Sequence, residues 1–219
     1  MSKRTGKGVP FVKLSGVVNP RDAEFAVSLG VSHIGCVFYE NSPRNVDIAK
    51  AKDIFKAAED VAKANNTKVT TVLEFRGHSK ASILEISKKT GCRTLQIAGF
   101  TEADVLALQK DKFNASRVFE LTASTQLLPL QKPEPSAKAP SLFTLATTGT
   151  ELTFPWEVLG ELAPANTFIG GGVRPENVRA LLTHSPWGIN LCAGVERHPG
   201  ELDHARLEML FEPLNEQTD

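Results

Sequence analysis

Short runs of β-branched, aliphatic and aromatic residues alternate along the chain with longer segments in which apolar residues recur every three or four positions. The short runs are typical of buried strands, and the longer segments are typical of helices with one apolar face. Strands are predicted at residues 9–14, 33–38, 68–75, 94–97, 117–121, 141–145, 166–169 and 188–191. Helices are predicted at residues 20–29, 47–65, 80–90, 101–109, 155–161, 174–183 and 201–215. The alternation indicates consecutive βα units from one end of the chain to the other.

The number of these units favours a closed barrel. Eight strands with intervening helices in 219 residues fit one (β/α)8 barrel better than an open doubly wound sheet. One unit is irregular, because residues 128–140 contain four prolines, which remove amide donors and prevent a continuous helix. We therefore predict an α/β fold with a single TIM barrel domain at residues 9–215, a degenerate fifth helix, and a flexible N-terminal segment at residues 1–8.

Charge and apolar content narrow the choice of partner. The 25 basic and 25 acidic side chains balance, so no net positive field attracts a polyanion, and no nucleic acid partner is expected. No apolar run approaches the roughly 18 residues that cross a bilayer, and the basic N-terminus lacks the apolar core of a signal peptide. We expect a cytoplasmic protein that contacts no membrane and binds a small molecule.

The three cysteines give no sign of a metal or a disulfide framework. Cys36, Cys92 and Cys192 are odd in number, far apart, and form no CxxC pair. Structural zinc sites need closely spaced cysteine or histidine ligands. The cysteines are therefore interpreted as reduced thiols, and no metal site is predicted.

Two turns rich in small residues follow the predicted seventh and eighth strands, in Ile169-Gly-Gly-Gly-Val-Arg-Pro-Glu-Asn177 and Leu191-Cys-Ala-Gly-Val-Glu196. Without Cβ atoms the backbone can turn successive N–H groups toward an anion, and the start of a following helix adds partial positive charge. Barrel enzymes often hold a phosphate at this place. Tight packing of the turns is the alternative interpretation. The predicted phosphate-binding residues are Gly171, Gly172, Ala193 and Gly194.

Several short motifs, in this order and spacing, resemble the phosphoribosylanthranilate isomerase family of tryptophan biosynthesis. They are Val12-Lys-Leu-Ser-Gly16, Asn19-Pro-Arg-Asp-Ala23, Ser42-Pro-Arg44, Leu95-Gln-Ile97, Gly170-Gly-Gly-Val-Arg-Pro-Glu-Asn-Val178 and Gly194-Val-Glu-Arg-His-Pro-Gly200. The resemblance implies a (β/α)8 fold, no metal, no cofactor, and a site for a phosphorylated ribosylamine. It also implies an Amadori rearrangement, in which an acid opens the ribose ring and a base removes the C2 proton.

The residues that the family uses as base and acid differ in this chain. The family's base is a cysteine, and Ser15 stands in its place; a hydroxyl lacks the near-neutral pKa that lets a thiolate accept a carbon-bound proton. The family's acid is an aspartate, and Ala146, which has no transferable proton, stands in its place. The family's Asp-Val-Ser-Ser-Gly at the eighth strand appears as Asn190-Leu-Cys-Ala-Gly194.

Other family positions are retained and predict contacts with substrate. Arg44 matches the arginine that meets the anthranilate carboxylate, and its planar fork suits a bidentate contact; a surface arginine after a turn is the other interpretation. Lys13 either orients the first-strand site or pairs with a carboxylate at a strand end. Gln96 either bonds the ligand or satisfies nearby backbone. The family often has a histidine two places after this glutamine, where the chain has Ala98.

Replacement acids and bases would have to come from other strand ends. Glu74 and Glu120 are polar residues in otherwise apolar strand patterns, and a carboxylate enclosed in a barrel mouth can acquire a pKa suited to proton transfer. Cys192 is a third candidate. A solvated glutamate facing outward, or a small buried thiol, is the structural alternative for each.

Three hypotheses follow for the function. The first is an isomerase-like enzyme in which Ser15, Glu74, Glu120 or Cys192 supports altered acid/base chemistry on a phosphoribosyl-amine or related phosphorylated ligand. The second is a catalytically inactive paralogue that binds or senses such a ligand. The third is the family's own isomerase activity, retained despite Ser15 and Ala146. The sequence favours the first hypothesis narrowly.

Overall fold

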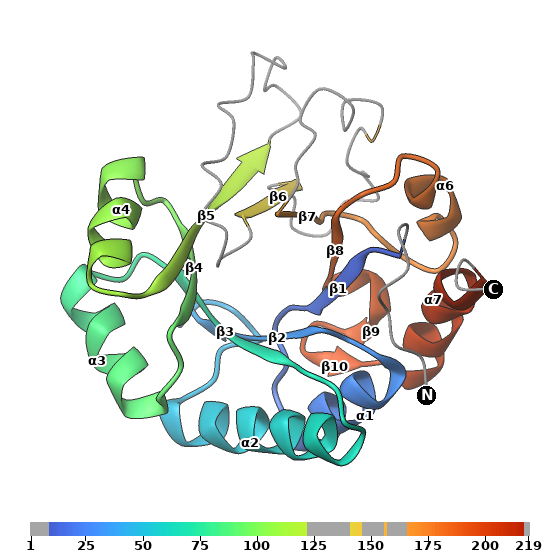
Figure 1. The fold of residues 1–219 in the computed structure, drawn as a ribbon, viewed down its shortest axis with the longest axis horizontal. Coiled ribbons are helices and arrows are strands. Elements are labelled where there is room, and N and C mark those ends of the chain that lie inside the picture. The colour runs from blue at the N-terminus through green and yellow to red at the C-terminus, as the bar shows by residue number, and fades with distance from the viewer. Residues whose placement is uncertain (1–8, 122–140, 146–155, 157–165, 217–219) are drawn as a thin grey trace.

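The computed structural model describes residues 9–121, 141–145, 156 and 166–216, and in these residues eight parallel strands close into a barrel. Strands are hydrogen-bonded in chain order, and β8 pairs with β1 to complete the ring (Figure 1). The barrel strands are β1 (Phe11–Leu14), β2 (His33–Phe38), β3 (Thr70–Arg76), β4 (Thr94–Ala98), β5 (Asn114–Leu121), β6 (Ser141–Leu145), β7 (Thr167–Ile169) and β8 (Gly188–Leu191). The predicted (β/α)8 barrel is confirmed.

Helices surround the barrel on its outer side (Figure 1). They are α1 (Pro20–Leu29), α2 (Ile48–Ala64), α3 (Lys80–Thr90), α4 (Glu102–Lys110), α6 (Val178–Leu182) and α7 (His204–Glu216). Polar side chains cap the first four of these helices; for example, Asn19 Oδ1 accepts from the Asp22 amide at 2.9 Å. None of the described helices is long and apolar enough to cross a membrane.

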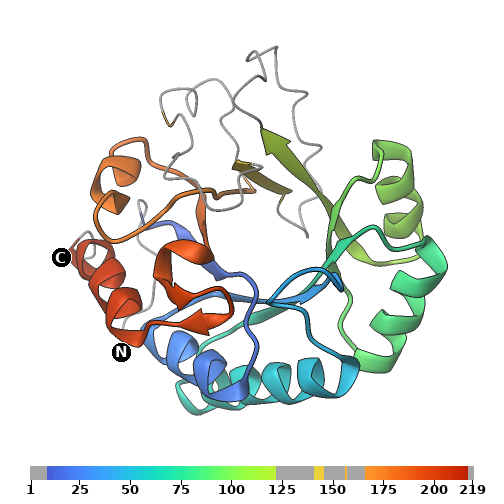
Figure 2. The same ribbon diagram turned by 180° about the vertical axis from the view of Figure 1, so that it is seen from behind.

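Two segments near the C-terminus differ from the predicted pattern. A short antiparallel hairpin, β9 (Glu196–His198) and β10 (Glu201–Leu202), occupies residues placed partly in the last helix, which begins only at His204. Gly200 adopts a φ of +87°, which allows the tight turn. Figure 2 shows this hairpin beside α7 and the chain that leads from β1 to α1. The alternating polar residues of the hairpin gave no apolar period by which to recognise it.

The predicted helix at residues 174–183 is also shorter, because a side chain replaces its first turn. Asn177 accepts from the Arg174 amide at 2.9 Å and donates to the Gly172 carbonyl at 2.8 Å, so residues 172–177 form a bonded loop ahead of α6. The degenerate fifth helix, residues 1–8, and all of the predicted helix at 155–161 except the buried Trp156 lie outside the described residues.

The register of the strands identifies the side chains that share the inner face of the barrel. Lys13 is paired with His33 and with Asn190, and Glu74 is paired with Gln96. Because side chains alternate along a strand, the residues two positions away lie on the same face. The register therefore gathers polar side chains from β1, β3, β4 and β8 inside one ring.

Aromatic rings close the amino-terminal end of the barrel. His33 lies between Phe11 and Phe168, with ring centroids 6.2 and 4.9 Å away, and Trp187 packs on both phenylalanines. Gly188 provides the space, since a Cβ there would lie 2.6 Å from the Phe168 ring. Burial, assisted by the charge of Lys13, lowers the pKa of His33 to about 4.

This buried histidine predicts a loss of stability in mild acid. Between pH 6.5 and about 4 the unfolded chain binds a proton at His33 that the folded chain does not, so stability is full above this window and falls as the pH drops through it. The contribution of His33 to the free energy of unfolding should fall by about 3 kcal/mol. Chemical denaturation from pH 7.5 to 4 measures it, and His33→Gln should flatten that part of the profile. An equal slope in both proteins would contradict the prediction.

Candidate functional site

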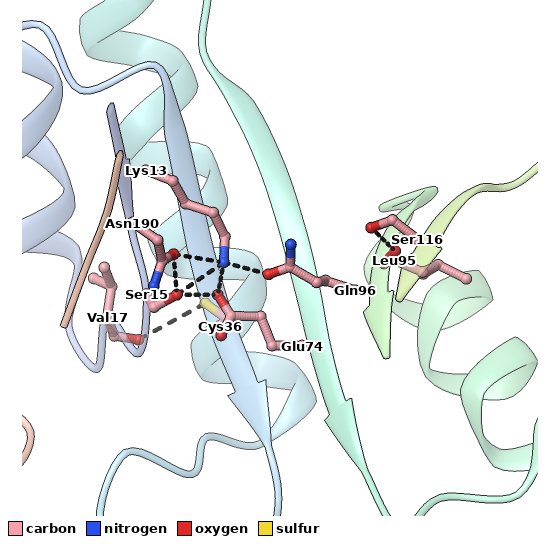
Figure 3. Close-up of polar contacts among 9 residues, drawn as sticks. All are labelled: Lys13, Ser15, Val17, Cys36, Glu74, Leu95, Gln96, Ser116 and Asn190. Atoms are coloured by element: carbon pink, nitrogen blue, oxygen red, sulfur yellow. Dashed lines mark hydrogen bonds and ion pairs between the residues drawn. The ribbon is translucent and has the colours of Figure 1, made fainter. Parts of the chain in front are cut away.

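The centre of the site is the ammonium group of Lys13, which is completely buried inside the barrel. Its Nζ atom lies 2.8 Å from Ser15 Oγ, 2.8 Å from Glu74 Oε1, 2.5 Å from Gln96 Oε1 and 3.0 Å from Asn190 Oδ1 (Figure 3). Four acceptors around three N–H donors satisfy the cation without water. The structure thus brings together four predicted residues, Lys13 and Ser15 at the first strand, Glu74 on the third and Gln96 on the fourth, and adds Asn190 from the eighth.

Ser15 links the side chains of Glu74 and Asn190 at this centre. Its hydroxyl lies 2.9 Å from Glu74 Oε1 and 2.7 Å from Asn190 Oδ1, and its single proton can be donated to one of them at a time. The residue is 7% exposed, so it lines the interior rather than the surface. Ser15, which the sequence motif aligns with the family's base, is therefore in hydrogen-bond contact with the carboxylate of Glu74.

Glu74 faces the barrel interior, and the fold leaves room for it. A Cβ on Gly35 would lie 1.7 Å from Glu74 Oε1 and 3.4 Å from Lys13 Cε, so a side chain at that position of β2 would have to displace the carboxylate. The side chain of Glu74 is 15% exposed, which keeps the carboxylate near the edge of solvent while Lys13 below it has none. Glu74 is therefore not a solvated glutamate that faces outward, which was the alternative interpretation.

Glu120 has a different environment. The pairing of Gln96 with Ser116 places Glu120, four residues along β5, on the same inner face but closer to the mouth. There it forms an ion pair with Arg76, and the side chains are 29% and 45% exposed. The structure does not bring Glu120 into contact with the Lys13 cluster, which consists of Lys13, Ser15, Glu74, Gln96 and Asn190. The Glu120 carboxylate is already paired with Arg76.

Cys192 is half-buried after β8, and burial raises the pKa of its thiol to about 11, with the negative charge of Glu196 acting in the same direction and Arg44 opposing it. At neutral pH the sulfur therefore carries its proton. This environment disfavours Cys192 as a proton acceptor.

Arg44 lies beside the turn that follows β1 and is held by Glu196, which was not among the predicted site residues. Its Nε atom donates to Glu196 Oε1 at 2.8 Å, and Nη2 donates to Glu196 Oε2. Hydrogen bonding to Glu196 is the main cause that raises the pKa of the guanidinium. The alternative of a solvated surface arginine does not fit, since only 17% of the side chain is exposed. The sequence signal that could have identified Glu196 is its place in the Gly194-Val-Glu196 motif, which the family shares.

The two predicted phosphate turns adjoin each other. Gly171 and Gly172 have φ values of +88° and +73°, and a Cβ on Gly194 would lie 1.9 Å from the Val173 carbonyl oxygen. Ala193 and Gly194 begin a 3-10 turn, η2 (Ala193–Val195), at which leading amides have no partner within the turn. Among the described residues, no acceptor bonds the amides of Gly171, Gly172, Ala193 or Gly194.

This close approach predicts a strong response to Gly194→Ala. The added methyl group meets backbone rather than a flexible side chain, so the two turns must separate, and the free energy of unfolding should fall by about 1 to 3 kcal/mol. Chemical denaturation measures it. Gly77→Ala is the matched control, because no atom lies within 4 Å there and only its positive φ opposes the substitution. A cost for Gly194→Ala no larger than the control's would contradict the predicted contact.

No group of three or more histidine, cysteine, aspartate or glutamate side chains in the described part of the chain is arranged to hold a metal ion. Ala146, which the sequence analysis aligns with the family's acid, lies outside the described residues.

The fold and the site define a class of protein. A closed (β/α)8 barrel with polar side chains converging inside it, and with small-residue turns after strands seven and eight, is typical of barrel enzymes, which frequently hold a phosphate at those turns. The family model for N-(5'-phosphoribosyl)anthranilate (PRA) isomerase matches residues 12–213. The chain belongs to this family of isomerases.

Individual relatives agree with the family match. An N-(5'-phosphoribosyl)anthranilate isomerase of Chlamydia muridarum is 32% identical over 199 residues, covering 87% of this chain and 88% of the relative. The crystal structure of phosphoribosyl anthranilate isomerase from Thermus thermophilus has a TM-score of 0.79 at 21% identity, covering 94% of this chain and 99% of that one. A phosphoribosyl anthranilate isomerase in complex with reduced 1-(o-carboxyphenylamino)-1-deoxyribulose 5-phosphate has a TM-score of 0.70 at 20% identity, with the same coverage.

Proposed function

We propose that this protein isomerises a phosphorylated ribosylamine bearing an aromatic carboxylate, and that Glu74 replaces the family's thiolate as general base. The observation that carries the proposal is the 2.9 Å distance between Glu74 Oε1 and Ser15 Oγ, because Ser15 stands where the family places its base. A carboxylate at hydrogen-bond distance from that position can reach a proton that the thiolate would have taken. Ser15 then orients the carboxylate and takes no proton itself.

After ring opening, the chemistry takes one proton from C2 and one from the C2 hydroxyl and returns one to C1. In the ring-opened iminium form, Glu74 takes the C2 proton, the electrons of the C2–H bond form the C1–C2 double bond, and the C=N π electrons move to nitrogen, which gives the neutral enolamine. The enolamine becomes the ketone when C1 takes up a proton and the C2 hydroxyl releases one. Lys13, 2.8 Å from Glu74 Oε1, holds the carboxylate in place throughout. Alanine at position 146 donates no proton to the ring oxygen, so another donor must supply the proton that opens the ring.

Two further features support a ligand of this type. The amides of Gly171, Gly172, Ala193 and Gly194, in the turns after β7 and β8, have no partner among the described residues and suit a phosphate, as expected from the sequence. Arg44 offers a planar edge for a carboxylate at the same end of the barrel. The ligand of the related solved structure carries both a phosphate and an aromatic carboxylate.

A non-catalytic binding or regulatory protein is the second candidate, and one observation favours it. Lys13, Ser15, Glu74 and Asn190 hydrogen-bond one another, so the cluster is satisfied without a ligand. In that case the turns after β7 and β8 would still bind the phosphate and Arg44 would still bind the carboxylate, but no proton would be transferred.

Incubation with phosphoribosylanthranilate deuterated at C2 separates the two functions. We expect consumption of the substrate above the protein-free rate, with loss of the deuterium to solvent. Binding of the reduced product analogue by calorimetry, without consumption or exchange, would reject the isomerase in favour of the binding protein. No heat with millimolar analogue would reject both.

A further inference from the structure

The pair formed by Arg44 and Glu196 is more enclosed than an ordinary surface ion pair. The side chains are 17% and 8% exposed, and two nitrogens of the guanidinium meet both oxygens of the carboxylate. Such a fork-to-fork contact fixes the plane and the rotation of the guanidinium as well as its position. Arg44 is therefore held in one orientation before any ligand arrives.

The hairpin missed in the sequence holds the other end of this contact. The Gly200 amide donates to Glu196 Oε1 at 3.1 Å, so one oxygen of the carboxylate accepts from both the hairpin and the arginine. Gly200 also packs closely against the loop that carries Arg44, since a Cβ there would lie 3.1 Å from the Pro43 carbonyl oxygen. The hairpin and the Ser42-Pro43-Arg44 loop thus form one contact unit around the carboxylate.

The stem of Arg44 lies on the turn that follows β1. A Cβ on Gly16 would lie 2.4 Å from Arg44 Cδ, and Gly16 has a φ of +74°. Gly16 is next to Ser15, so the arginine lies against the turn that leads out of the Lys13 cluster. Within the described residues, Arg44 Nη1 has no hydrogen-bond partner. Glu196 occupies the Nε edge and leaves the Nη1 edge for another planar anion.

We propose that Glu196 is a positioning residue, which selects ligands bearing a carboxylate by presenting the Nη1 edge of Arg44 to them. This inference rests on the proposed function, because it assumes that the ligand's carboxylate meets Arg44. Without Glu196 the guanidinium keeps its charge but can rotate. Binding a carboxylate in bidentate geometry then costs conformational entropy, because the ligand must fix the orientation of Arg44. Glu196 therefore contributes to affinity only when the ligand has the carboxylate.

The test compares two ligands that differ by this one group. Calorimetry measures the reduced product analogue, with its o-carboxyphenylamino group, and the counterpart with an unsubstituted phenylamino group. For Glu196→Gln we expect about 10-fold weaker binding of the first ligand and unchanged binding of the second. Arg197→Gln is the matched control on the same hairpin, since Arg197 is exposed and pairs with Asp203; it should change neither affinity. Equal weakening of both ligands by Glu196→Gln would show a structural role and overturn the proposal.

A second measurement requires no variant and no phosphorylated ligand. The Nε–H resonance of Arg44 in the wild-type protein should be protected from solvent exchange, and it should shift with benzoate but not with aniline. If neither phosphorylated analogue binds, the proposed function fails, and this titration still decides the role of Glu196. A resonance that exchanges freely, or that does not respond to benzoate, would overturn the positioning proposal alone.

Discussion

Glu74→Gln is expected to lower isomerase turnover by about 10² to 10⁴-fold, the usual range for the loss of one acid or base. The amide keeps the shape of the side chain and can still bond Ser15, but it accepts no carbon-bound proton. Affinity for the reduced product analogue should change far less, because the proposed phosphate and carboxylate contacts lie elsewhere. Steady-state kinetics with phosphoribosylanthranilate, together with calorimetry of the analogue, measures both quantities.

Two other glutamates make this result interpretable. Glu85→Gln removes an exposed carboxylate on α3 that pairs with Lys89, and turnover should be unchanged. Glu120→Gln removes the other candidate base, which Arg76 already occupies, and we expect only a small decrease. Turnover that survives Glu74→Gln but is lost in Glu120→Gln would identify Glu120, at the barrel mouth, as the base and would contradict the assignment to Glu74.

Lys13→Met is expected to destabilise the fold by about 3 to 5 kcal/mol, because breaking a buried ion pair leaves the partner charge without compensation. Lys13 is 0% exposed and lies within hydrogen-bond distance of Ser15, Glu74, Gln96 and Asn190. Methionine fills a similar volume but offers no donor to any of them. Chemical denaturation at neutral pH measures the change.

An exposed lysine and a double variant test the physical reason. Lys56→Met removes an i,i+4 ion pair with Asp60 on the surface of α2, and stability should hardly change. Adding Glu74→Gln to Lys13→Met removes the uncompensated carboxylate and should recover part of the loss. A Lys13→Met protein as stable as the wild type would mean that water enters the cluster and satisfies Glu74.

The hydrophobic periodicity of the sequence was sufficient to predict the barrel and its order of strands, because each βα unit buries one apolar strand and one apolar helix face locally. The starts of α1 to α4 were equally predictable, since a single side chain such as Thr101 or Ser79 bonds an amide three residues away. The hairpin at β9 and β10 was not, because its stability depends on contacts with Pro43 and the β1–α1 loop that only the closed fold creates.

The site was predictable in part and for similar reasons. Lys13, Ser15 and Gln96 could be chosen from strand position and motif, and Glu74 from its polarity in an apolar strand. Their convergence on one ammonium group depends on the register between strands, which the sequence does not state. Gly35 and Asn190 complete the cluster from other strands, and Glu196 reaches Arg44 across 152 positions of chain, so local patterns did not reveal them as partners.

A crystal structure with the reduced product analogue bound is the most direct test of the account. We predict that its phosphate accepts from the amides of Gly171, Gly172, Ala193 and Gly194, and that the carbon corresponding to C2 faces Glu74 Oε1 at about 3 to 3.5 Å. A phosphate seated away from those turns, or a C2 position that Lys13 and Asn190 separate from Glu74, would contradict the account.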